Sequence, residues 1–358
     1  MPGESPVWGN RTRSRGIQAP HTCLDFGSAK PARPKGTASL RRRITLTVAT
    51  MSCLAWPIGL SAAIDPAPPA ATSFSLGRFR VDVLSDSRSM IANDGKTYAV
   101  GIDPSIVADV LRRAGMASDN ISLDIDALLV RDGRRKILID SGFGPRSGGA
   151  ILQSLARAGA RPDDIRDVLI THGHGDHVGG LLAQDGRSSY PNAIIHIALA
   201  EWRRMQTQLN RADLVRAIAR QVHTFVPGQE VLPGIRSIPL PGHTTGHVGY
   251  ELRSGTARLL DIGDIAHNSI IELAHTDWPF AYDEDAATAS HSRQALFARL
   301  ALSRELVFSP HFPYPGVGRI GRIGGGFAWL PARLERSSRS PPSIACSPCP
   351  SRLGSGVK

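Results

Sequence analysis

The side chains most able to do chemistry gather in one glycine-spaced run, Thr171-His172-Gly173-His174-Gly175-Asp176-His177-Val178-Gly179-Gly180. In an extended segment residues i and i+2 face the same side, so His172 and His174 can hold one metal ion from a single loop. Asp176 and His177 follow where the chain turns into the next element, and they can face a second ion. In a chain with 12 His, chance assembly of His-x-His-x-Asp-His is on the order of one in a thousand, which favours a metal motif over four solvated loop residues.

Three further donors each follow an apolar run that we expect to be a strand. The donors are His243, Asp264 and His311, and the runs before them are 235–240, 259–262 and 306–308. Ligands just beyond strand ends in one α/β scaffold can converge on a single edge of the sheets. The sequence therefore predicts one site that contains five His and two Asp.

Short apolar runs alternate with helical patterns from residue 74 onward, which predicts an α/β domain. The expected strands are 79–84, 127–130, 136–139, 168–170, 193–197, 235–240, 248–252, 259–262 and 306–308. The expected helices are 104–114, 148–158, 198–209, 211–221 and 285–302.

The composition and charge exclude several classes of protein. With 41% hydrophobic and 20% charged residues, the chain is neither a polytopic membrane protein nor wholly disordered. The net charge of +11 comes from the ends, because residues 1–50 hold nine Lys/Arg against two Asp/Glu and residues 332–358 hold five against one. Of the 42 basic and 31 acidic residues, 28 of each remain in 51–331, so the body is neutral and a nucleic-acid partner is not expected.

The N-terminal region predicts export. Residues 1–40 are rich in Pro, Gly, Ser and basic residues, which predicts a disordered extension. Residues 41–63 have the basic, apolar and small-residue order of an export signal. Its three arginines also fit the twin-arginine route, although Leu40 stands where Ser or Thr is usual. Pro57 and Gly59 interrupt an apolar run that is short for a membrane span, so we expect cleavage, no stable membrane association and a periplasmic or secreted protein.

The remaining boundaries follow from composition. Residues 64–73 are expected to be a linker, 74–334 the folded domain and 335–358 a disordered tail. A start codon assigned too far upstream would explain the long segment before the signal. Cys346 and Cys349 have redox or zinc spacing, but a single pair in a Ser/Pro-rich tail is a weak indication. The body itself offers no thiolate, since none of the four cysteines lies between residues 54 and 345.

Taken together, these motifs resemble the metallo-β-lactamase fold superfamily, whose pattern is His-x-His-x-Asp-His followed by a distant His, an Asp and a His. The resemblance implies an αββα sandwich, with two mixed sheets and a dinuclear metal site at their edge. It also implies that His172, His174 and His243 bind one ion, that Asp176, His177 and His311 bind the other, and that Asp264 bridges them. This ligand set implies two bound divalent metal ions. Zn is the expected metal, and Mn, Fe and Co are the alternatives.

Within this superfamily the chain is similar to the branch of methyl parathion hydrolase and the N-acyl homoserine lactonases. Most of this narrower similarity rests on His311-Phe312-Pro313-Tyr314-Pro315-Gly316-Val317-Gly318. It implies a metal-dependent hydrolase in which a metal-bound hydroxide cleaves a lactone, ester or phosphotriester of a small molecule. Asp176 and Asp264 are then the catalytic candidates, because both would position the hydroxide and one of them could move a proton to the leaving group.

Two other functions remain open at this stage. One is a phosphodiesterase or nuclease of the same fold, which the neutral body and export signal disfavour. The other is a non-hydrolytic protein that uses the same ligands for iron redox chemistry. The pattern does not indicate the substrate or the oligomeric state.

Other polar and aromatic residues carry weaker signals. His247 is expected to be structural, and Asp140 is either a turn residue or a partner of a ligand. Five histidines are expected to lie at the surface or in the core, namely His196, His223, His267, His275 and His291. Five aromatic residues could line a pocket or pack in the core, namely Trp278, Phe280, Tyr282, Phe312 and Tyr314.

Overall fold

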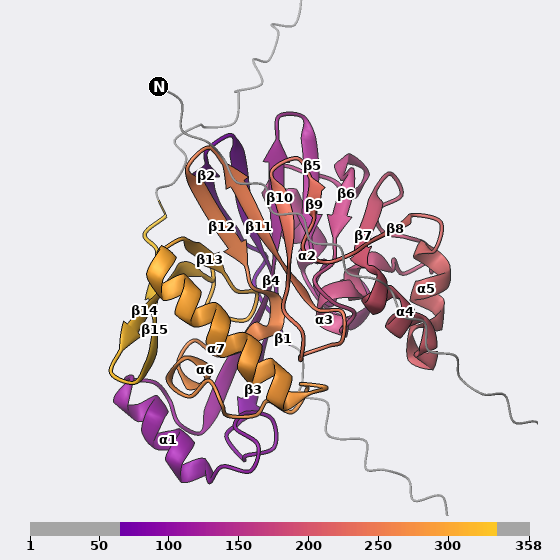
Figure 1. Cartoon of the computed structure of the whole chain (residues 1–358). Coiled ribbons are helices and arrows are strands. Elements are labelled where there is room, and N and C mark those ends of the chain that lie inside the picture. Colours follow the sequence, from indigo (N-terminus) through magenta and orange to yellow (C-terminus); the bar gives the residue numbers. More distant parts are fainter. Residues whose placement is uncertain (1–64, 335–358) are drawn as a thin grey trace, which may run out of the picture. The chain divides into compact units, whose positions relative to one another are not determined.

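The computed structural model describes residues 65–334, which form two facing sheets with helices on their outer sides (Figure 1). The expected αββα sandwich is therefore confirmed. The predicted extension, the export signal and the C-terminal tail with its cysteine pair lie outside the described residues. Within the described part of the chain, no helix combines the length and apolar character needed to cross a bilayer.

The first sheet has the order β1-β3-β4-β5-β6-β7-β8, with β2 paired to β3. Its strands are β1 (Asp65–Pro66), β2 (Ala71–Leu76), β3 (Phe79–Ala92), β4 (Asn120–Asp132), β5 (Arg135–Ile139), β6 (Asp167–Leu169), β7 (Ile194–Ala198) and β8 (Val222–Phe225). The pairs from β5 to β8 are parallel, whereas the pairs from β1 to β5 are antiparallel.

The second sheet has the order β15-β14-β13-β12-β11-β10-β9. Its strands are β9 (Glu230–Leu232), β10 (Ile235–Pro239), β11 (Val248–Ser254), β12 (Ala257–Asp261), β13 (Leu306–Phe308), β14 (Val317–Ile323) and β15 (Gly326–Pro331). Only β12 and β13 pair in parallel in this sheet, because the long helix between them returns the chain to the same end.

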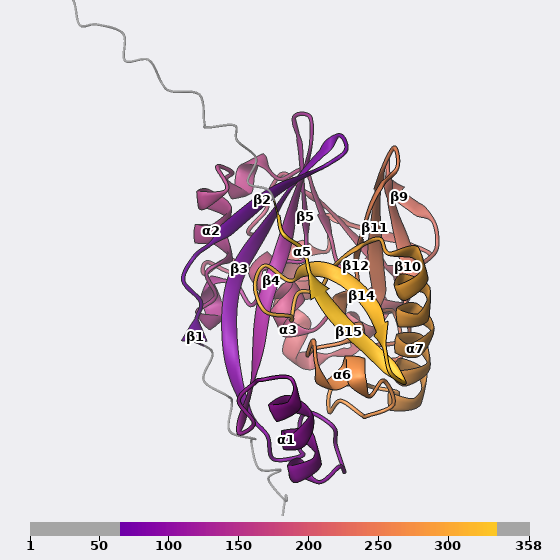
Figure 2. The ribbon, with the colours of Figure 1, turned by 90° about the vertical axis from the view of Figure 1, so that its left-hand side faces the viewer.

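Most helices lie on the outer sides of the sheets, whereas the helix Pro104–Arg113 lies beyond the ends of the long strands β3 and β4 (Figure 2). The helices are α1 (Pro104–Arg113), α2 (Ile151–Arg157), α3 (Gly175–Val178), α4 (Leu199–Thr207), α5 (Ala212–Ile218), α6 (Ile271–Ala274) and α7 (Ala286–Ser303), with 3₁₀ turns η1 (Pro145–Ser147), η2 (Pro162–Asp164), η3 (Gly179–Leu181), η4 (Leu209–Arg211) and η5 (Gly263–Ile265). Helices α1 and α7 begin at capping aspartates. Asp103 accepts a hydrogen bond from the Ser105 amide at 2.8 Å, and Asp285 accepts one from the Thr288 amide at 3.0 Å.

Three apolar clusters account for the layers. Between the sheets, residues such as Leu128 and Ile139 of the first sheet pack against Tyr250 and Phe308 of the second. A second cluster joins the outer face of the first sheet to α2, α4 and α5. A third joins the outer face of the second sheet to α7, and includes the fully buried Phe297. Central strands such as β4, β6 and β12 thus bury consecutive residues on both faces, which explains the continuous apolar runs in the sequence.

The structure differs from the sequence-based expectations mainly at sheet edges. Part of the expected linker 64–73 belongs to the first sheet, because β1 and the start of β2 pair with β3. Strands β8, β9, β14 and β15 were not expected. Arg and Gly interrupt the apolar pattern of β14, and its pairing with both β13 and β15 outweighs that low strand propensity.

The loop after β5 packs directly under the metal-motif loop, and this contact requires glycine. A Cβ at Gly180 would lie 2.0 Å from the Ser141 carbonyl oxygen, and one at Gly179 would lie 2.4 Å from the Phe143 carbonyl oxygen. The backbone at Ser141 cannot move away without losing hydrogen bonds. Its amide and its hydroxyl both donate to the His177 carbonyl oxygen, at 2.8 Å each. The two glycines therefore fix the position of α3.

We expect Gly180→Ala to lower the free energy of unfolding by about 1–3 kcal/mol, because the added methyl group overpacks this contact. Gly325→Ala is the matched control, since a Cβ there meets nothing within 4 Å and its φ is not in the left-handed region. Thermal or denaturant unfolding of both variants measures the difference. Equal stability of the two variants would contradict the close contact.

Candidate metal centre

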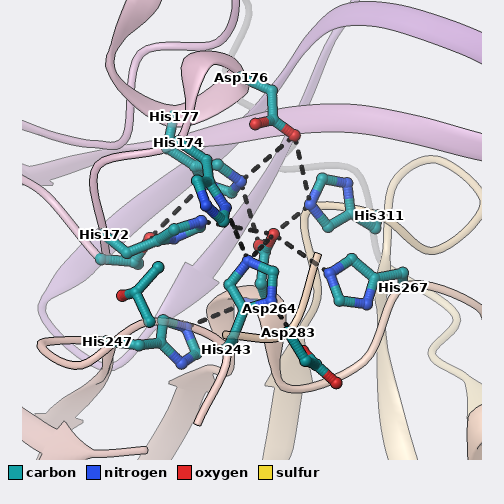
Figure 3. Close-up of polar contacts among 12 residues, drawn as sticks. His172, His174, Asp176, His177, His243, His247, Asp264, His267, Asp283 and His311 are labelled. Atoms are coloured by element: carbon teal, nitrogen blue, oxygen red, sulfur yellow. Dashed lines mark hydrogen bonds and ion pairs between the residues drawn. The ribbon is translucent and has the colours of Figure 1, made fainter. Parts of the chain in front are cut away.

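All seven side chains predicted from the sequence meet at one edge of the two sheets (Figure 3). The motif loop follows β6, and the other three segments follow β10, β12 and β13 of the second sheet. They form two groups that could each hold a metal ion: His172, His174, His243 and Asp264, and Asp176, His177, Asp264 and His311. Within each group the candidate ligand atoms lie within 4.8 Å of one another. Asp264 belongs to both groups, as expected of a bridging residue.

The two carboxylate oxygens of Asp264 face different groups. Its Oδ1 lies 3.0 Å from Nε2 of both His177 and His311. Its Oδ2 lies 3.2 Å from His243 Nε2 and 3.5 Å from His172 Nε2. Burial alone would raise the pKa of Asp264, but the surrounding imidazoles hold it well below its usual value. The carboxylate is thus an anion between two clusters of nitrogen donors.

Several ring nitrogens at this centre have no satisfactory hydrogen-bond partner among the described residues. Such nitrogens are free to bind a metal ion. Nε2 of His172 and of His177 are buried without a hydrogen bond. His174 Nδ1 and His243 Nε2 point at each other across 2.9 Å. Burial lowers the pKa of His172, and it lowers that of His174 to about 3, which favours the neutral form that binds metals. The donors are nitrogen and oxygen only, so they fit Zn, Mn, Fe or Co.

The outer nitrogen of each buried histidine is held by another group, so its Nε2 faces the centre. His311 Nδ1 lies 2.8 Å from the Asp124 carbonyl oxygen. His243 Nδ1 lies 2.9 Å from Asp283 Oδ1, a carboxylate that the sequence did not single out. Such partners fix the tautomer and orientation of a metal-binding imidazole.

Asp140 fills both roles that the sequence left open. It adopts a left-handed conformation with φ of 59° directly after β5, and its carboxylate turns back into the site. There it accepts hydrogen bonds from the Thr171 amide at 2.9 Å and the Thr171 hydroxyl at 2.7 Å, and it lies 2.8 Å from His177 Nδ1. One carboxylate therefore orients both the start of the motif loop and one of its histidines.

His267 lies at the centre, although the sequence assigned it no site role. Its Nε2 is 3.3 Å from Asp264 Oδ2, and its ring stacks on Phe280 with centroids 3.6 Å apart. Burial would lower its pKa, but Glu272 and Asp264 raise it to about 9. Arg293, buried on α7, lies 3.5 Å from Glu272 and 3.2 Å from Asp283, so it links this histidine to the partner of His243. The one sequence feature that could have indicated a site role for His267 is its position three residues after Asp264.

His247 is a buried structural residue, as expected. Its Nδ1 lies 2.8 Å from the Leu240 carbonyl oxygen, and its Nε2 accepts a hydrogen bond from the Asp264 amide at 3.0 Å. Burial lowers its pKa to about 3, so the ring is neutral and can accept that bond. His247 thus positions the backbone of Asp264 and stands in neither donor group.

Glu201, at the start of α4, joins the loops of the two sheets. Its buried carboxylate accepts hydrogen bonds from the Gly173 amide at 2.8 Å, the Thr244 hydroxyl at 2.7 Å and the Gly246 amide at 3.1 Å. The first of these belongs to the motif loop and the others to the loop of His243. Sequence analysis missed this residue because it lies on a helix far from both motifs.

The centre is accessible on one side. The side chain of Asp176 is 18% exposed, and His174 and Gly175 beside it are half-buried, whereas the other ligands are buried. Of the aromatic candidates, Phe280 stacks on His267 at the centre, whereas Phe312 is buried against Trp329 and Tyr282 is exposed. A substrate would therefore reach the metals over the segment 174–176.

Comparisons with known proteins agree with this geometry. The profile of the family described as "Metallo-beta-lactamase superfamily" matches residues 123–311, more than half of the chain. The protein YobT of Bacillus subtilis is 30% identical over 145 residues, which are 37% of this chain and 59% of YobT. A "probable metallo-hydrolase" of Mycobacterium tuberculosis is 24% identical over 54% of this chain and 73% of its own length.

Two solved structures resemble the described fold over nearly their whole length. The dizinc quorum-quenching lactonase AidC, in complex with a product, has a TM-score of 0.70 and 25% identity, and the match covers 75% of this chain and 99% of AidC. The hydrolase AbOPH has a TM-score of 0.68 and 26% identity, with coverage of 75% and 99%. From the family profile, the sandwich fold and the two donor groups, we conclude that this chain belongs to the metallo-β-lactamase superfamily.

Proposed function

We propose that this protein is a dinuclear metal-dependent hydrolase that opens lactones, with esters and phosphotriesters as weaker substrates. The observation that carries the proposal is the sharing of Asp264 between two groups of His and Asp donors. Two bound ions would lower the pKa of water to about 7 and polarise the bond under attack, so no Ser or Cys nucleophile is needed. The resemblance to a dizinc lactonase supports the lactone as the preferred substrate.

The two catalytic candidates differ in what they can reach. Asp264 is 3% exposed, and both of its oxygens face imidazoles, so it is suited to hold the two ions at a fixed spacing. Asp176 is the more exposed carboxylate, and it lies at the open side of the centre. We therefore assign to Asp176 the transfer of a proton to the leaving group.

We expect two metal ions per chain, measured by elemental analysis of active protein. Asp264→Ala should lose metal from both groups and reduce kcat/KM by about 1,000-fold or more, because the shared ligand is removed. His247→Ala is the matched comparison, since it is equally buried but belongs to neither group. It should retain both ions and lose at most about 10–100-fold in rate, together with some thermal stability. Retention of two ions by Asp264→Ala would contradict the shared site.

The substrate class can be tested with zinc-loaded protein and four probes. These are N-hexanoyl-L-homoserine lactone, 4-nitrophenyl acetate, paraoxon and bis(4-nitrophenyl) phosphate. We expect kcat/KM for the lactone to exceed that for paraoxon by about tenfold or more, with little cleavage of the phosphodiester. Preferential cleavage of the phosphodiester would instead favour a phosphodiesterase, and no turnover of any probe by protein with two metals would contradict the hydrolase proposal.

A further inference from the structure

Arg211 lies beside the open side of the metal centre. It ends η4, and its two terminal guanidinium nitrogens lie 3.5 and 3.6 Å from the position that a Cβ of Gly175 would occupy. Phe143 borders the same position at 3.8 Å. Gly175 stands between His174 and Asp176, the two partly exposed ligands. The guanidinium therefore lies next to the path that a substrate takes to the metals.

This cation has no anionic partner in the described part of the chain. No carboxylate there lies within 4.0 Å of it, and its Nε is buried without a hydrogen bond. Its neighbour Arg204 differs, because it pairs with Glu201 at 3.0 Å and with Glu284 at 2.5 Å. Burial lowers the pKa of Arg211, while the nearby Asp176 offsets part of this effect. Arg211 is partly buried, and partial withdrawal of a cation from water without a paired anion costs free energy, so no ion pair within the fold explains its position.

The chemistry of the guanidinium indicates which kind of group would pair with Arg211. A guanidinium presents paired donors that match the two oxygens of a carboxylate. Asp176 does not replace that partner, because its carboxylate is assigned to a metal ion. We propose that Arg211 binds a carboxylate on the substrate, so that the preferred lactones and esters carry an anionic group at the end that lies over Gly175. This inference rests on the proposed hydrolase function and adds a specificity-determining residue to it.

The first test compares two esters of the same chain length, 4-nitrophenyl butyrate and mono-4-nitrophenyl succinate, which differ by a terminal carboxylate. We expect the zinc-loaded full chain to prefer the succinate ester. Arg211→Gln should lose about 10–100-fold in kcat/KM for this ester, mainly through KM, because one charge-assisted pair is removed. Its rate with the neutral ester should stay within about twofold of wild type. Arg211→Lys should recover part of the preference, since it keeps the charge but not the paired donors.

The control variant is Arg216→Gln, on the neighbouring helix α5. Arg216 is exposed and pairs only with Asp213, so both esters should be hydrolysed as by wild type. Thermal unfolding gives a second readout. Arg211→Gln should unfold at the same temperature as wild type or a higher one, because an unpaired and partly buried cation is removed. A clear loss of stability, or equal rate losses with both esters, would assign Arg211 a structural role and overturn the proposal.

A binding measurement separates failure of this inference from failure of the proposed function. Calorimetry with succinate and butyrate requires no turnover, and both anions can offer one carboxylate to the metals. Wild type should bind succinate more tightly, and Arg211→Gln should bind the two equally. If neither ester nor any lactone is hydrolysed, the hydrolase proposal fails while this comparison still decides the role of Arg211. Equal binding of the two anions by wild type would overturn the inference.

Discussion

The buried carboxylate of Asp264 is the charge on which the rest of this centre depends. A carboxylate withdrawn from water must be compensated, and five imidazoles lie within 3.5 Å of it, those of His172, His177, His243, His267 and His311. These rings need fixed orientations, which Asp140, Asp283 and Glu272 supply from three different segments. The His247 ring fixes the backbone of Asp264 itself. The need to compensate this one carboxylate therefore fixes side chains in segments of both sheets.

The sequence pattern predicted an α/β domain and the donors of this centre, and the family resemblance supplied the layered arrangement. Apolar runs bounded by turns identified most central strands, because strands covered on both faces carry a continuous apolar signal. The spacing of the residues from His172 to His177 was sufficient to place four donors in one loop. The remaining three, His243, Asp264 and His311, were found because each directly follows such a strand. The structure brings all seven together, as the strand ends suggested.

The surrounding groups could not be predicted, because their roles arise only from tertiary contacts. Glu201 and Arg293 lie on helices whose patterns resemble those of ordinary surface helices, yet both are buried. Nothing local distinguishes Asp283 from other loop aspartates until it meets His243. Strands at or next to a sheet edge, such as β8 and β14, were missed for a related reason, since their half-exposed or glycine-containing sequences depend on neighbouring strands for stability.

The division of the donors between two sheets also constrains the order in which the centre can assemble. The motif loop is complete once the first sheet has been synthesised, but His311 must find the Asp124 carbonyl across 187 residues of sequence. Contacts of such long range form late, since the loop that they close is entropically costly. A growing or partly folded chain therefore exposes four donors before the remaining three arrive. A metal ion bound at that stage would be held by an incomplete set of ligands. Selection of one metal over another would then require the second sheet to dock.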